Sequence, residues 1–94
     1  GGELISISVK WCDSMKSKAE TSSPSNSACN LLVFASNAPF SIDNMYDGTL
    51  TSIGSINYRN NETSYTFATS YKYIGLRSEL GAVNMESITI SWKA

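Results

Sequence analysis

Both ends of the chain alternate between apolar and polar residues with a period of two. In residues 3–11, apolar side chains occupy every second position from Ile5 to Trp11, with serine or lysine between them. Residues 86–93 repeat this arrangement, with isoleucine or tryptophan alternating with serine, threonine and lysine. Because successive side chains of a β-strand point to opposite faces, this period predicts two strands that each bury one face. The residues predicted to be almost fully buried are Ile7, Val9, Ile88 and Ile90, and both Trp11 and Trp92 continue the buried stripes.

The middle of the chain carries further strand signals separated by turns. Residues 29–36 are apolar on both faces, which predicts a strand covered on both sides or an edge strand under a folded loop. Residues 49–58 break strict alternation between Ile53 and Ile56, and a β-bulge at Gly54 would restore it. Further strands are predicted at residues 63–69 and 71–78. The spacing predicts an all-β, antiparallel β-sandwich of about seven to eight strands, jelly-roll-like or Ig-like, with less than about a tenth of the chain in helix.

Composition and charge argue against several classes of function. A chain of 94 residues supports a single domain, and a net charge of −1 with scattered basic residues offers no footprint for nucleic acid. The absence of histidine removes the usual general base and the commonest zinc ligand. The longest apolar run, residues 31–35, is far too short to span a membrane. We therefore expect that the chain is not an enzyme, that it binds no metal, cofactor or nucleic acid, and that it does not insert into a membrane.

Two cysteines flank a serine-rich segment. Cys12 closes the first predicted strand, Cys29 opens the second, and serine supplies six of residues 14–28. If those strands are antiparallel neighbours, a disulfide would join their matching ends and stabilise the fold by about 3 kcal/mol. Two buried thiols are the alternative. Serine, threonine and asparagine make up about a third of the chain, which favours the disulfide and a secreted or cell-surface protein.

Residues 37–48 form a long connection that contains the residue types of sugar-binding sites. Asn44 and Asp47 offer groups that bond to sugar hydroxyls, and Tyr46 offers a ring for the apolar C–H face of a sugar. The alternative is an ordinary surface loop, in which aspartate and asparagine make local turns and apolar side chains tuck into the sandwich edge.

A second candidate binding surface lies on the predicted strand 71–78. Tyr71, Tyr73 and Arg77 share one face of this strand, where rings and a guanidinium would form a flat platform for a ligand or partner. The alternative is that one tyrosine lies in the core and the other side chains pair with residues of neighbouring strands.

The closing part of the chain resembles a known group of modules. A strand that reads Tyr-Ile-Gly-x-Arg-Ser at 73–78 leads through Gly81-Ala82 into a final Ile-x-Ile-x-Trp strand at 88–92. These residues resemble the closing half of small jelly-roll or galactose-binding-like β-sandwich accessory modules in secreted multi-domain proteins of gut anaerobes. The resemblance implies a β-sandwich with an accessory role within a larger multi-domain protein. It carries over no binding residues, because ligand loops in such modules vary freely.

These patterns favour a non-catalytic binding module of a secreted or cell-surface protein, with a polysaccharide or other glycan as the ligand class. The alternative is a structural or adhesive Ig-like spacer domain with no small-molecule ligand. The terminal strands favour this alternative in one respect, because their polar faces suit stacking between neighbouring domains.

Overall fold

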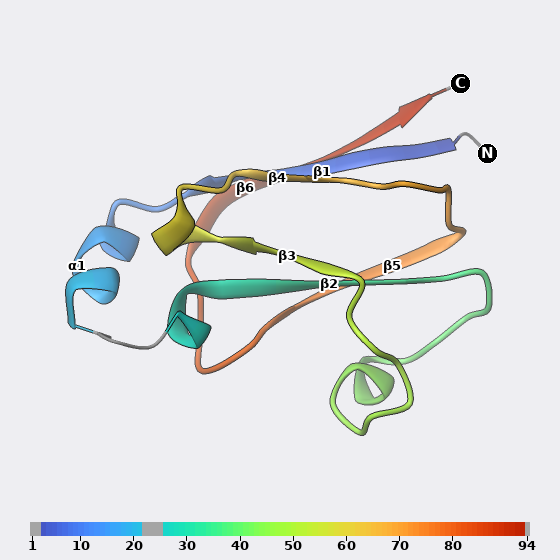
Figure 1. Cartoon of the computed structure of the whole chain (residues 1–94), viewed down its shortest axis with the longest axis horizontal. Helices are drawn as coiled ribbons and strands as arrows, with labels where there is room; N and C mark the ends of the chain where they lie inside the picture. The colour runs from blue at the N-terminus through green and yellow to red at the C-terminus, as the bar shows by residue number, and fades with distance from the viewer. Residues whose placement is uncertain (1–2, 22–25, 94) are drawn as a thin grey trace.

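The computed structural model describes residues 3–21 and 26–93, and it places six strands of this part of the chain in two antiparallel three-stranded sheets. The strands are β1 (Glu3–Trp11), β2 (Asn30–Ser36), β3 (Gly54–Asn57), β4 (Ser64–Thr66), β5 (Tyr73–Ser78) and β6 (Met85–Lys93). The first sheet has the order β4-β1-β6 and the second has the order β3-β2-β5. Figure 1 shows them as two layers, with β1 and β6 side by side. The prediction of a small antiparallel β-sandwich is therefore confirmed.

The core lies between the inner faces of the two sheets. Its buried members are Leu4, Ile7, Val9, Leu31, Val33, Ala35, Ile56 and Phe67. β2 is the central strand of its sheet and is buried on both faces, with Val33 0% and Phe34 2% exposed. The apolar pattern of residues 29–36 therefore correctly predicts a strand covered on both sides.

The number of strands is smaller than the seven or eight predicted. Each of the six segments named from the sequence forms one strand, and the described residues contain no further one. Two of the strands are also shorter than predicted, because turns and connections leave only four residues of 49–58 to β3 and three residues of 63–69 to β4. Gly54 makes no bulge, since its register with β2 is regular. It is needed for close packing instead, because a Cβ there would lie 2.1 Å from Cε1 of the Tyr65 ring.

The bulges lie in the β1–β6 ladder instead. The register shifts between Leu4 and Ser6 and again near Trp11. Leu4 and Ile7 stand on either side of the first shift and both point into the core, whereas Ile5 is 40% exposed. An extra residue in a ladder reverses the facing of the residues beyond it, which strict alternation does not reveal.

The last strand presents the predicted face to the core, but the predicted burial of its isoleucines is wrong. Ile7 and Val9 are buried as predicted, but Ile88 and Ile90 are 43% and 40% exposed and Trp92 is 50% exposed. The register places Ile88 opposite Val9 and Ile90 opposite Ile7, so these pairs share one face of the sheet. β6 is the outer strand of that sheet, however, and its apolar face is only partly covered.

The chain also contains an α-helix that the sequence analysis did not predict, α1 (Ser14–Thr21). Methionine, lysine, alanine and glutamate favour helix, but only Met15 is buried, so the segment lacks the apolar period that predicts one. Asn84 donates its backbone N–H to the Met15 sulfur at 3.3 Å, and Lys18 donates to the carbonyl of Ala82. The helix therefore packs beside the turn that leads into β6. Residues 22–25 of the serine-rich segment lie outside the described residues.

Three short 3-10 turns add to the helical content: η1 (Ser27–Cys29), η2 (Ile42–Met45) and η3 (Tyr58–Asn60). With α1, they bring helix to 21% of the described residues, against 44% strand. The prediction of less than a tenth in helix is therefore wrong. Short turns of this kind are set by local hydrogen bonds and leave little trace in the apolar pattern.

The predicted disulfide is also absent, because Cys12 and Cys29 are both free thiols. The prediction rested on β1 and β2 being antiparallel neighbours, but these strands lie in different sheets. Cys12 is half-buried and donates its backbone N–H to the carbonyl of Asn84 at 3.0 Å. Cys29 is 0% exposed and behaves as a small apolar residue, which is the alternative considered above.

Candidate functional site

The connection between β2 and β3 folds over the outer face of the second sheet. In Figure 1 its turn η2 lies on the side of that sheet that faces away from the first sheet. Ser41 and Asn44 cap η2 reciprocally, and the Ser41 backbone N–H donates to Oδ1 of Asn44 at 2.9 Å. Met45 is buried above Gly75 of β5, where a Cβ would lie 2.5 Å from the methionine sulfur. The glycine therefore makes room for the loop to dock.

Arg77 of β5 joins this loop to the sheet. Its guanidinium lies 4.7 Å from the centroid of the Tyr46 ring and 5.6 Å from that of the Phe34 ring. Its Nε donates to the carbonyl oxygen of Met45 at 2.8 Å. The structure thus brings together Tyr46 and Arg77, which the sequence analysis placed in two separate candidate sites.

Tyr73 does not join this cluster. It shares a face of β5 with Arg77, but four residue positions correspond to about 13 Å along a strand. Between them lies Gly75, which Met45 and Phe40 cover. Tyr73 is 42% exposed and lies opposite Ser36 of β2. A continuous platform of Tyr73 and Arg77 is therefore interrupted by the docked loop.

Asn44 and Asp47 shape the loop that presents Tyr46. The backbone N–H of Thr49 donates to Oδ1 of Asp47 at 2.8 Å. Hydrogen bonds from the Thr49 side chain and backbone, with a smaller one from the Asn44 side chain, lower the pKa of the Asp47 carboxyl. These are the local turn contacts of an ordinary surface loop. Any role in ligand binding would use the remaining hydrogen-bonding capacity of these side chains.

The lowered pKa of Asp47 predicts how the loop responds to acid. A carboxyl whose pKa falls on folding stabilises the folded loop at neutral pH, and this contribution is lost as the pH drops through the lowered pKa. As the pH drops through the lowered pKa of Asp47, we expect the loop to become more mobile and the NMR resonances of the Tyr46 ring to shift accordingly. Asp47→Asn should show the looser spectrum already at neutral pH. Identical Tyr46 spectra for the two proteins at neutral pH would contradict this role of the carboxylate.

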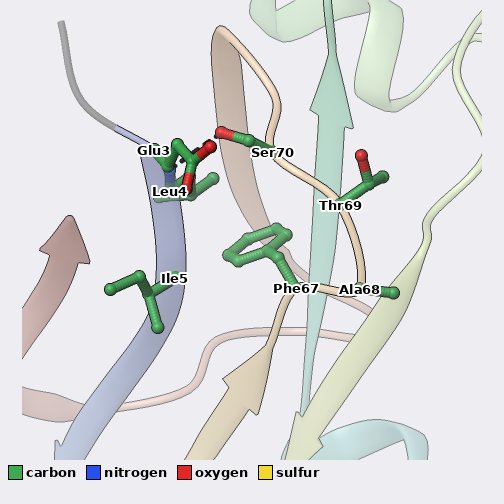
Figure 2. Close-up of a pocket in the computed structure, with 7 residues that line it drawn as sticks. All are labelled: Glu3, Leu4, Ile5, Phe67, Ala68, Thr69 and Ser70. Carbon is green, nitrogen blue, oxygen red and sulfur yellow. Dashed lines mark hydrogen bonds between the residues drawn. The ribbon is translucent and has the colours of Figure 1, made fainter. Parts of the chain in front are cut away.

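A pocket of about 380 Å³ lies at the other side of the molecule, between the start of β1 and residues 67–70. Figure 2 shows Ser70 turned toward Leu4, whose backbone N–H donates to the serine hydroxyl at 2.9 Å. Glu3 lines the rim, and Phe67 lies beneath. Phe67 is only 8% exposed, so its ring belongs to the core and offers little surface for stacking. This pocket is therefore a weaker candidate than the surface around Tyr46.

A smaller groove of about 200 Å³ is lined by Trp11, Tyr58, Asn61 and neighbours, and the sequence analysis did not find it. The two rings are 5.8 Å apart and meet at 87°, edge to face. The Trp11 Nε1–H donates to the carbonyl of Glu62 at 2.8 Å. The indole is thus engaged in packing, and the two rings form no common flat surface. Only the fold brings these two distant segments together, which no local motif indicates.

Comparisons with known proteins add no family to this description. No protein-family model, no curated protein and no solved structure matches the chain. Within residues 3–21 and 26–93, no three histidine, cysteine, aspartate or glutamate side chains are grouped as metal ligands. In the same residues, no helix combines the length and the apolar character needed to cross a membrane.

Proposed function

We propose that this chain is a non-catalytic binding module whose ligand class is carbohydrate. The observation that carries the proposal is the position of Tyr46. The residue is 66% exposed, yet the Arg77 guanidinium stacks on its ring and the loop beneath is capped and anchored. A ring that is exposed but held in a fixed orientation suits stacking on the C–H face of a sugar.

Polar groups around the ring support the same ligand class. Asp43, Asp47 and Ser41 are exposed on the same short loop, and the Asp47 carboxylate is held in place by Thr49. Carboxylates and amides accept and donate the hydrogen bonds that orient sugar hydroxyls. The site is open rather than enclosed, which is consistent with binding one face of a polysaccharide chain.

The proposal predicts that removing the Tyr46 ring weakens glycan binding. The experiment first identifies a ligand on a broad glycan array with added polysaccharides, then measures its affinity for the variants by calorimetry. Tyr46→Ala should weaken binding about 5- to 100-fold, because the stacking surface is lost. Tyr46→Phe should retain most of the affinity, and Lys16→Ala in α1 should leave it unchanged.

Two outcomes would reject this proposal. One is the absence of any glycan binding at millimolar protein concentration. The other is an affinity that Tyr46→Ala and Lys16→Ala leave equally unaffected.

We further propose that the chain is a jelly-roll accessory module of a secreted or cell-surface multi-domain protein. The support is that the residues of the resemblance, 73–78 and 88–92, form the whole of β5 and part of β6. Sequencing the gene beyond both ends of this chain tests the idea, and a neighbouring polysaccharide-degrading domain is the expected result.

A second candidate function is a structural or adhesive domain, Ig-like in its role, that binds other protein domains. The apolar residues exposed on β6 favour it, because exposed apolar patches often mark sites of contact with other proteins. This function does not exclude glycan binding, since β6 and Tyr46 belong to different parts of the sandwich, and Tyr46 packs on the second sheet.

A further inference from the structure

The edge of β6 that faces away from β1 has no strand paired to it among the described residues. β6 has nine residues, whereas the other outer strands β3, β4 and β5 have four, three and six. Natural sheets usually blunt such edges with short strands, prolines, or charges in the middle of the strand. Residues 87–92 contain no charge, no proline and no glycine. The long β6 edge is therefore suited to pairing with another strand.

Apolar side chains of β6 are also partly exposed to solvent beside this edge. Ile88, Ile90 and Trp92 are 43%, 40% and 50% exposed, and they follow one another on one face of the strand. That face continues the inner face of β1, because Ile90 lies opposite the buried Ile7. A further strand beside β6 would extend the sheet and cover these side chains from the open side.

We propose that the strand beside β6 is the β6 of a second copy of this chain, paired antiparallel about a two-fold axis. With Thr89 at the axis, Ile88 of one copy lies opposite Ile90 of the other, so apolar residues face apolar residues. The charges of the strand lie at its two ends, Glu86 at one and Lys93 at the other. Antiparallel pairing brings the acidic end of each copy beside the basic end of the other, which is the complementarity that a symmetric contact requires.

Glu86 keeps its existing partner in this arrangement. It forms a 3.0 Å salt bridge with Lys10 of β1, and the side chains of Glu86 and Lys10 are largely exposed, at 49% and 74%. Because the Glu86 carboxylate is exposed, it can also contact Lys93 of the second copy while it stays paired with Lys10. The product is one six-stranded sheet, in the order β4-β1-β6 followed by the reverse order in the second copy.

The test compares two isoleucine-to-lysine changes by analytical ultracentrifugation of the full chain from about 1 µM to about 1 mM. The wild-type chain should show a concentration-dependent dimer. Ile90→Lys, which places like charges near each other across the two-fold axis, should raise the dissociation constant at least about tenfold. Ile42→Lys is the matched control, because Ile42 is 70% exposed in the loop over the second sheet and its replacement should leave dimerisation unchanged.

A second measurement fixes the register and does not depend on the stability of Ile90→Lys. Thr89→Cys in a Cys12→Ser background should give a disulfide-linked dimer on mild oxidation, whereas Cys12→Ser alone should not. A wild-type chain that stays monomeric at all concentrations would overturn the proposal. So would a dimer that Ile42→Lys and Ile90→Lys affect equally, or a dimer in which Thr89→Cys gives no cross-link. Each of these results would rule out this pairing of two β6 edges, and none depends on glycan binding.

Discussion

Ile7→Ala should lower the free energy of unfolding by about 2–5 kcal/mol, which is the cost of removing most of a fully buried aliphatic side chain. Ile7 is 0% exposed, lies in the central strand of its sheet, and pairs with Tyr65 on one side and Ile90 on the other. Because both neighbours are fixed by the strand ladders, they cannot move far to fill the space that the change would leave. Urea unfolding followed by tryptophan fluorescence gives the value.

Ile90→Ala is the matched control, because it removes the same atoms from the directly opposite position. Ile90 is 40% exposed, so its truncation should cost less than about half as much as that of Ile7. The measurement is made at about 1 µM, to keep any pairing of β6 edges out of the comparison. Equal costs would mean that β6 is covered as fully as β1, which would contradict the partial exposure of Ile90.

Arg77→Ala should have the second largest effect, on the loop that carries the candidate site. The change removes a guanidinium that lies near both the Phe34 and the Tyr46 rings, and leaves the Met45 carbonyl without its 2.8 Å donor. Loss of one charged hydrogen bond and the ring contacts should cost about 2–3 kcal/mol. Faster hydrogen exchange in residues 41–47, with β1 amides changing less, is the expected pattern.

Arg77→Lys distinguishes the geometry of the guanidinium from its charge. Lysine keeps the charge but lacks the planar group that stacks on the rings, so it should restore less than half of the lost stability. Full recovery by lysine would show that charge alone holds the loop. No change in loop exchange in Arg77→Ala would show that Met45 and Phe40 suffice to dock it.

The sequence predicts the sandwich because its strongest signals are local. The alternation in β1 and β6 and the doubly apolar β2 depend only on the period of a strand and on burial. Ile7 and Val9 are therefore assigned correctly to the core. The same local signals place Tyr46, Asn44 and Asp47 on a connection outside the strands.

What the sequence misses depends on which strands are neighbours. The disulfide fails because β1 and β2 belong to different sheets, and Ile88 and Ile90 are exposed because β6 is an outer strand. Neither outcome can be predicted from the residues of the strand itself. The stacking of Arg77 on Tyr46 has the same origin, since the two side chains lie far apart in the sequence and only the folded loop brings them together.

Amide chemical-shift mapping with an oligosaccharide is the direct test of the claim, proposed above, that the loop around Tyr46 binds carbohydrate. We expect the largest shifts in residues 41–47 and at Arg77, with little change around Glu3 and Ser70 or along β6. Shifts confined to the pocket between β1 and residues 67–70, or at Tyr73 without Tyr46, would contradict the claim. So would a spectrum that no oligosaccharide changes at millimolar concentration.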